Sequence, residues 1–86
     1  MKLSTLIAAR AQQISVTGQF HSNFTGVIPS PCLSICRMTR DGSHCEGCFR
    51  TLDEIRTWSQ AGAARRRAIW ADLLRRAGVA LPEELA

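Results

Sequence analysis

The four cysteines of the chain lie within one short segment. They are Cys32, Cys36, Cys45 and Cys48, spaced as C-x3-C-x8-C-x2-C. Two close pairs of thiolates joined by a loop suit a tetrahedral zinc site, because each pair spans one edge of the tetrahedron. Asp41-Gly42, between the pairs, is typical of a tight turn that folds Cys36 back towards Cys45. The pattern predicts a metal site formed by all four cysteines, and a structural Zn²⁺ ion is the first interpretation.

Two other kinds of chemistry compete with zinc. Four cysteines also suffice for an iron–sulfur cluster, although neither common ferredoxin spacing is present. Two disulfides would require an oxidising compartment, and residues 1–13 do not resemble a secretion signal because their apolar stretch is short and closed by Arg10. A thioredoxin-like role for the last cysteine pair lacks the necessary strand–helix context. The metal interpretations are favoured, and the choice between zinc and a cluster stays open. His44, in the loop, is interpreted as a solvated turn residue and not as a ligand, and His21 lies in the presumed linker with no partner in sight.

The size of the protein supports a structural role for the metal. At 86 residues the chain is one small domain. Below about 70–80 residues a hydrophobic core rarely supplies more than roughly 3–5 kcal/mol, so a metal or disulfides usually add to it. Outside the cysteines we find no nucleophile–base pair, paired carboxylates or phosphate-cradling loop. The sequence therefore predicts a non-catalytic binding or adaptor module in the cytoplasm, without a membrane span.

The arginines indicate a preference for anionic partners. The net charge of the protein is +4. Three consecutive arginines occupy the first turns of a predicted helix, where the unfavourable interaction of positive charge with the helix dipole costs about 0.3–1 kcal/mol per exposed group. The favoured interpretation is that they cover apolar surface and keep the protein soluble. The alternative is an anion site for a nucleic acid backbone or an acidic protein face. The six candidate residues are Arg65, Arg66, Arg67, Arg37, Arg40 and Arg50.

The C-terminal half predicts two helices. Thr51 and Glu54 form a capping box that begins the first, which should end between residues 59 and 62. An apolar stripe predicts the second helix over residues 63–77, and Gly78 suits a left-handed ending in which Val79 contacts the last turn. Trp58 and Trp70 lie on the apolar stripes, so we expect core packing instead of base stacking. The helical hairpin therefore has an apolar side that another segment must cover.

The whole chain is predicted to be a small metal-stapled α-rich domain. Residues 1–29 are an N-terminal extension or linker, either poorly ordered or containing a short amphipathic helix. Residues 30–78 comprise the four-cysteine loop, with a short β-hairpin at most, followed by the helical hairpin. Residues 79–86 form a tail.

The motif SPC-x3-CR, followed by C-x-GC-x-RT-x-x-EI-x-x-W, resembles a small bacterial four-cysteine family of unknown function, called YdhL-like, over residues 30–75. The resemblance maps the four cysteines onto those of the family, which is commonly labelled a predicted iron–sulfur protein. The resemblance therefore favours the cluster interpretation, and it brings no enzymatic activity with it. The chain departs from the family at Gly62 and Arg65, where a Ser or Thr cap and a Glu are usual, and residues 1–29 have no counterpart. The other matching positions are Arg37, Arg50, Thr51, Glu54, Ile55 and Trp58.

Overall fold

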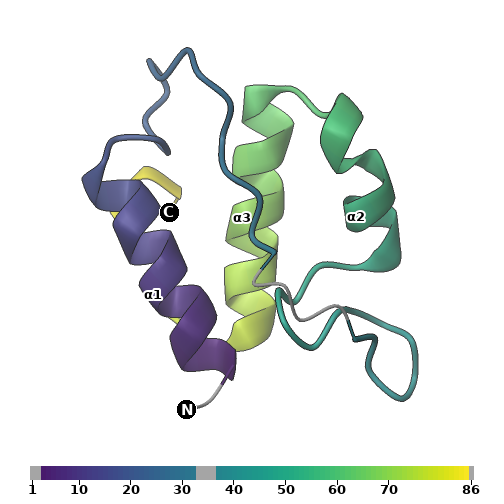
Figure 1. Cartoon of the computed structure of the whole chain (residues 1–86). Coiled ribbons are helices and arrows are strands. Elements are labelled where there is room, and N and C mark those ends of the chain that lie inside the picture. The colour runs from purple at the N-terminus through teal and green to yellow at the C-terminus, as the bar shows by residue number, and fades with distance from the viewer. Residues whose placement is uncertain (1–2, 33–36, 86) are drawn as a thin grey trace.

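The computed structural model describes residues 3–32 and 37–85, and these form a helical protein in which α3 lies between α1 and α2 (Figure 1). The chain of α3 runs opposite to both neighbours (Figure 1). Regular strands are absent from the described ranges, where the predicted hairpin is reduced to one antiparallel bridge between Met38 and Cys45. The α-rich class is confirmed. The elements are α1 (Leu3–Val16), α2 (Leu52–Thr57), the 3₁₀ turn η1 (Trp58–Gln60), α3 (Ala63–Ala77) and the 3₁₀ turn η2 (Glu83–Leu85).

Local sequence signals set the ends of α2 and α3. Both bonds of the predicted capping box are present: the Glu54 N–H donates to Thr51 Oγ1 at 3.2 Å, and the Thr51 N–H donates to Glu54 Oε1 at 2.9 Å. α3 begins after Gly62 without a side-chain cap, as its sequence predicts. It ends at Gly78, whose φ of 75° is left-handed, and the Val79 N–H donates to the Leu74 carbonyl at 3.2 Å.

One hydrophobic core joins the N-terminal segment to α3. The apolar face of α3, which the sequence predicted another segment would cover, packs against α1 and against the segment that follows α1. Trp70 is fully buried, contacts the Phe20 ring edge-on at a centroid distance of 5.3 Å, and donates from Nε1 to the Pro29 carbonyl at 3.0 Å. Its predicted core position is confirmed. The buried core residues are Ile7, Ala11, Ile14, Phe20, Ile28, Ile69, Trp70, Ala71, Leu73, Leu74 and Leu85.

The N-terminal extension takes the helical alternative. α1 buries Ile7, Ala11 and Ile14, the stripe expected from the sequence. The division into segments 1–29, 30–78 and 79–86 stays a prediction, although all three contribute to the core. In the part of the chain that the structure describes, every helix is too short or too polar to cross a membrane.

Candidate metal centre

Residues 45–50 form a closed turn around the second cysteine pair. The Cys45 N–H donates to the Arg50 carbonyl at 2.7 Å, and the Phe49 N–H donates to the Cys45 carbonyl at 2.8 Å. Phe49 has a φ of 63°, a left-handed conformation that disfavours a side chain by roughly 1–2 kcal/mol. The Phe49 side chain packs against the core, which offsets this strain. The turn buries both Cys45 and Cys48.

Backbone donors converge on the sulfur of Cys45. Burial raises the pKa of the Cys45 thiol, but hydrogen bonds from the backbone N–H groups of Cys48, Arg37 and Gly47, and from the Cys48 side chain, leave that pKa below its ordinary value. The Arg37 donor comes from the other arm of the loop, which is held by the Glu46 N–H donating to the Arg37 carbonyl at 2.7 Å. The fold therefore stabilises negative charge on Cys45.

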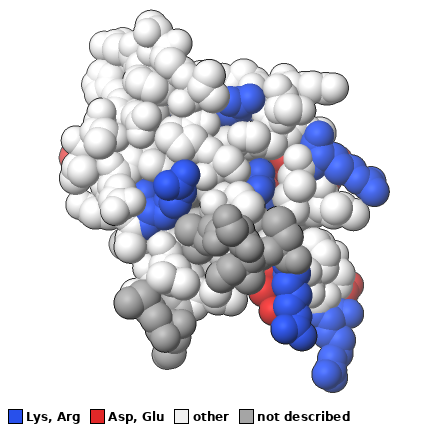
Figure 2. Space-filling model, in the orientation of Figure 1, with Lys and Arg blue, Asp and Glu red and all other residues white. Residues whose placement is uncertain are grey.

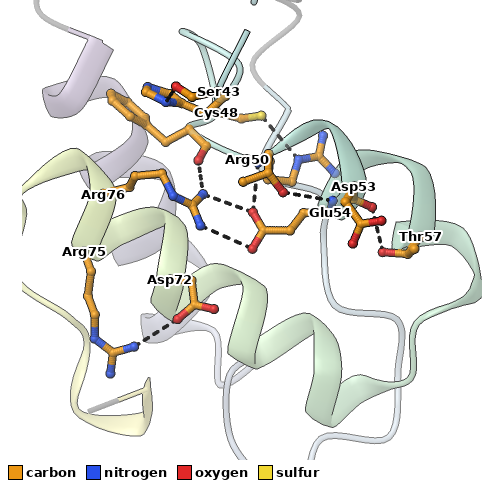
Figure 3. Close-up of polar contacts among 12 residues, drawn as sticks. Ser43, Cys48, Arg50, Asp53, Glu54, Thr57, Asp72, Arg75 and Arg76 are labelled. Atoms are coloured by element: carbon orange, nitrogen blue, oxygen red, sulfur yellow. Dashed lines mark hydrogen bonds and ion pairs between the residues drawn. The ribbon is translucent and has the colours of Figure 1, made fainter. Parts of the chain in front are cut away.

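Cys48 has a charged neighbour. Nε of Arg50 lies 3.3 Å from Cys48 Sγ, as Figure 3 shows. Burial raises the pKa of Cys48, and the hydrogen bonds from the side chain and backbone of Arg50 offset that effect only in part. A bound metal ion deprotonates its cysteine ligands, so it would stabilise the Cys48 thiolate, which this environment alone does not.

The first cysteine pair is described only at Cys32. Cys32 is half-buried, and its N–H donates to Ser30 Oγ at 3.2 Å. The segment before it is fixed to two helices, because Arg10 Nη2 of α1 donates to the Ser30 carbonyl at 3.1 Å and Trp70 of α3 bonds to Pro29. Cys36 lies outside the described residues. Within residues 3–32 and 37–85, no three candidate ligands are close enough to hold a metal, so the four-ligand site stays a prediction.

The described donors nevertheless fit a metal-bound thiolate site. Cys45 and Cys48 are adjacent, buried and surrounded by N–H groups. Hydrogen bonds to ligand atoms orient them and tune a bound metal. His44 is a half-buried turn residue. Its Nδ1 lies 2.9 Å from Ser43 Oγ, and its ring stacks on Phe49 at a centroid distance of 5.8 Å.

The six candidate arginines do not form one surface. Figure 2 shows the basic side chains on one face as separate groups. Arg50 is buried, and Arg66 donates to the Trp58 carbonyl at 3.1 Å and lies 5.1 Å from the Trp58 ring centroid, so both are used inside the fold. Arg67 is half-buried, and its Nη1 has no hydrogen-bond partner within the described segments. The exposed candidates are Arg37, which pairs with Glu46 at 3.8 Å, Arg40 and Arg65.

Sequence reasoning missed the residue that joins the loop to the helices. Arg76, in the last turn of α3, bonds from Nη1 to Glu54 Oε1 at 3.0 Å and also to the Phe49 carbonyl (Figure 3). Glu54 is buried at 5% exposure, although it lies in the first turn of α2. An antiparallel helical hairpin places the first turn of one helix beside the last turn of the next. The opposite charges at those two positions could therefore have predicted this ion pair from the sequence.

Comparison with known proteins adds a family and nothing about activity. No curated protein and no solved structure matches the chain. A family model described as a protein of unknown function, DUF1289, matches residues 30–77, which is more than half of the chain and contains all four cysteines. This range includes the segment on which the four-cysteine resemblance depends. The chain belongs to the DUF1289 family.

Proposed function

We propose that this protein is a non-catalytic binding module whose cysteine loop holds a structural Zn²⁺ ion through Cys32, Cys36, Cys45 and Cys48. The observation that carries the proposal is the closed turn of residues 45–50, whose backbone hydrogen bonds bury both Cys45 and Cys48. Structural zinc sites are closed and use four protein ligands, commonly cysteines. When bound, the ion would supply folding free energy and no reaction step.

An iron–sulfur cluster on the same four sulfurs is the second candidate. The Arg50 Nε contact with Cys48 Sγ favours keeping it, because hydrogen bonds to ligand sulfurs tune the reduction potentials of such clusters. The protein would then be a small redox carrier or sensor. The two candidates share their ligands and differ in the metal.

Metal analysis of full-length protein purified without oxygen tests the proposal. We expect colourless protein with about one zinc per chain. Brown protein containing iron and acid-labile sulfide would replace zinc with the second candidate. Cys45→Ser should lose the metal, whereas Ser43→Ala, in the same loop, should retain it. A parent protein that is folded and metal-free would overturn both candidates.

The partner is proposed to carry negative charge. With Arg50 and Arg66 engaged inside the fold, the exposed side chains Arg37, Arg40 and Arg65 are the ones that remain for contact. Nucleic acid binding through phosphates weakens steeply with salt. We expect binding of a fluorescent oligonucleotide at low salt that falls as salt is added and weakens further in Arg40→Gln. Undetectable or salt-independent binding would exclude a nucleic acid partner and leave an acidic protein face.

A further inference from the structure

Arg50 is a buried cation that has no carboxylate partner among the described residues. Its exposure is 6%, and the other buried charged residue within residues 3–32 and 37–85, Glu54, is paired with Arg76 at 3.0 Å. None of the ion pairs in the described ranges includes Arg50. Removing a cation from water costs several kcal/mol unless an anion or strong hydrogen bonds compensate. The contacts of the Arg50 guanidinium inside the fold must therefore compensate for this cost.

Arg50 contacts the sulfur of Cys48 and the ring of Trp58. Nε donates to Cys48 Sγ at 3.3 Å, and Cζ lies 5.4 Å from the centroid of the Trp58 ring. Trp58 offers the negative face of its π system, which attracts the guanidinium. The guanidinium therefore packs on one aromatic face while Nε points at the sulfur of a predicted metal ligand.

We propose that Arg50 is a positioning residue that supplies the counter-charge of the metal centre and holds Cys48 in its metal-ligating orientation. The inference rests on the proposed function and deepens it. Four thiolates around a divalent ion leave a net negative charge, and a buried guanidinium reduces it. The Arg50 backbone also accepts from the Cys45 N–H at 2.7 Å, so one residue contacts both members of the second pair.

The charge and the planar shape of the Arg50 side chain should contribute separately to metal affinity. Arg50→Gln removes the charge, whereas Arg50→Lys keeps it but loses the planar group that donates to sulfur while it packs on the Trp58 ring. Loss of a hydrogen bond to a metal ligand typically lowers metal affinity by about 10–100-fold. We expect that loss in Arg50→Gln and a smaller one in Arg50→Lys.

The test is a metal-affinity measurement on full-length, reduced protein. Zn²⁺ is competed against a chromophoric chelator, and Co²⁺ is added separately to record the sulfur-to-metal charge-transfer band. Arg56→Gln is the matched control, because it removes one positive charge from an exposed side chain of α2. We expect Arg56→Gln to bind zinc within about threefold of the parent, since an exposed charge contributes little.

The outcomes separate this inference from the proposed function. A loss in Arg50→Gln with none in Arg56→Gln supports the role of Arg50. Unchanged affinity in Arg50→Gln, or an equal loss in both variants, overturns it while the parent still binds metal. If Arg50→Gln does not fold, the cobalt band of Arg50→Lys decides: a shifted band supports the hydrogen bond to sulfur, and an unchanged band refutes it. A parent that binds neither metal overturns the proposed function and this inference with it.

Discussion

Replacing Arg76 with glutamine should destabilise the protein far more than replacing its neighbour Arg75. The Arg76 guanidinium donates to both carboxylate oxygens of Glu54, at 3.0 and 3.3 Å, and to the Phe49 carbonyl. The two charged side chains are 28% and 7% exposed. Arg75 pairs with Asp72 at 3.1 Å, but those side chains are 59% and 47% exposed. The same substitution therefore removes a largely buried ion pair in one variant and a surface pair in the other.

The size of the effect follows from what remains after the substitution. Arg76→Gln leaves the Glu54 carboxylate buried and charged, with the Thr51 N–H as a remaining donor. Breaking a fully buried pair costs about 3–5 kcal/mol, and the partial exposure of Arg76 reduces this to about 2–3 kcal/mol. A chain of this size is stable by roughly 5–10 kcal/mol. Arg75→Gln should lower the free energy of unfolding by at most about 0.5 kcal/mol.

The pH dependence gives an independent check. Burial raises the pKa of Glu54, but hydrogen bonds from the Arg76 side chain and the Thr51 backbone, with the charges of Arg76 and Arg65, leave it below its ordinary value of 4.5. The pair therefore stabilises the fold above that value, and this contribution is lost as pH falls through the lower, folded-state pKa. In Arg76→Gln burial dominates, so the Glu54 pKa should lie above the ordinary value. The difference in the free energy of unfolding between the parent and the variant should then become smaller between pH 7 and about pH 5, because Glu54 of the variant takes up a proton.

Urea unfolding followed by circular dichroism, at both pH values and with zinc in excess, measures these differences. The double variant Glu54→Gln/Arg76→Gln should be less destabilised than the sum of the single variants, because it leaves no unpaired charge. The reasoning is refuted if Arg76→Gln and Arg75→Gln unfold within about 0.5 kcal/mol of one another at pH 7.

Three further perturbations test other parts of the fold. Thr51→Ala removes the side-chain acceptor of the capping box and should lower the free energy of unfolding by about 1 kcal/mol, whereas Thr51→Ser should recover most of it in the same urea titration. Ile7→Ala should cost about 2–4 kcal/mol, because Ile7 is fully buried; a smaller change than about 1 kcal/mol would mean that α1 is not part of the cooperative unit. Chelation should shift the fluorescence of Trp58, observed in Trp70→Phe, by more than that of Trp70, observed in Trp58→Phe. Equal shifts would show that the metal loop and the core open together.

The helices could be predicted from the sequence because their ends are encoded locally. Thr51 and Glu54 are three residues apart, and their two hydrogen bonds close within one turn. Gly78 follows the last apolar position of α3 and adopts the left-handed conformation that its missing side chain permits. Such signals need no knowledge of the rest of the fold.

The cover over α3 could not be predicted in the same way. The helical hairpin had to be covered, but residues 17–31 show no periodicity, and Phe20 and Ile28 lie in a segment rich in Gly, Pro and polar residues. Their burial depends on contacts between distant positions, such as the Trp70–Pro29 hydrogen bond across 41 residues. No local pattern specifies which carbonyl a buried indole N–H will find.

The same distinction applies to the metal centre. Cysteine spacing indicates ligands, because thiolates are chemically suited to metals in almost any fold. Arg50 was grouped with surface arginines, since arginine is mostly exposed. Its burial becomes understandable only when its hydrogen bond to the neighbouring sulfur is counted, and that neighbour is known only from the turn that Cys45 and Cys48 adopt.

Polar contacts, more than the hydrophobic core, therefore orient the cysteine loop. Arg50 joins the sulfur of Cys48 to Trp58, and Arg76 joins the Phe49 carbonyl to Glu54. The fully buried core is supplied mostly by α1, residues 20–28 and α3, to which the loop adds the partly buried Phe49. Loops held by few apolar contacts open at lower free energy than the core. A bound metal would raise the free energy of that opening, and for this reason Trp58 should respond to chelation more strongly than Trp70.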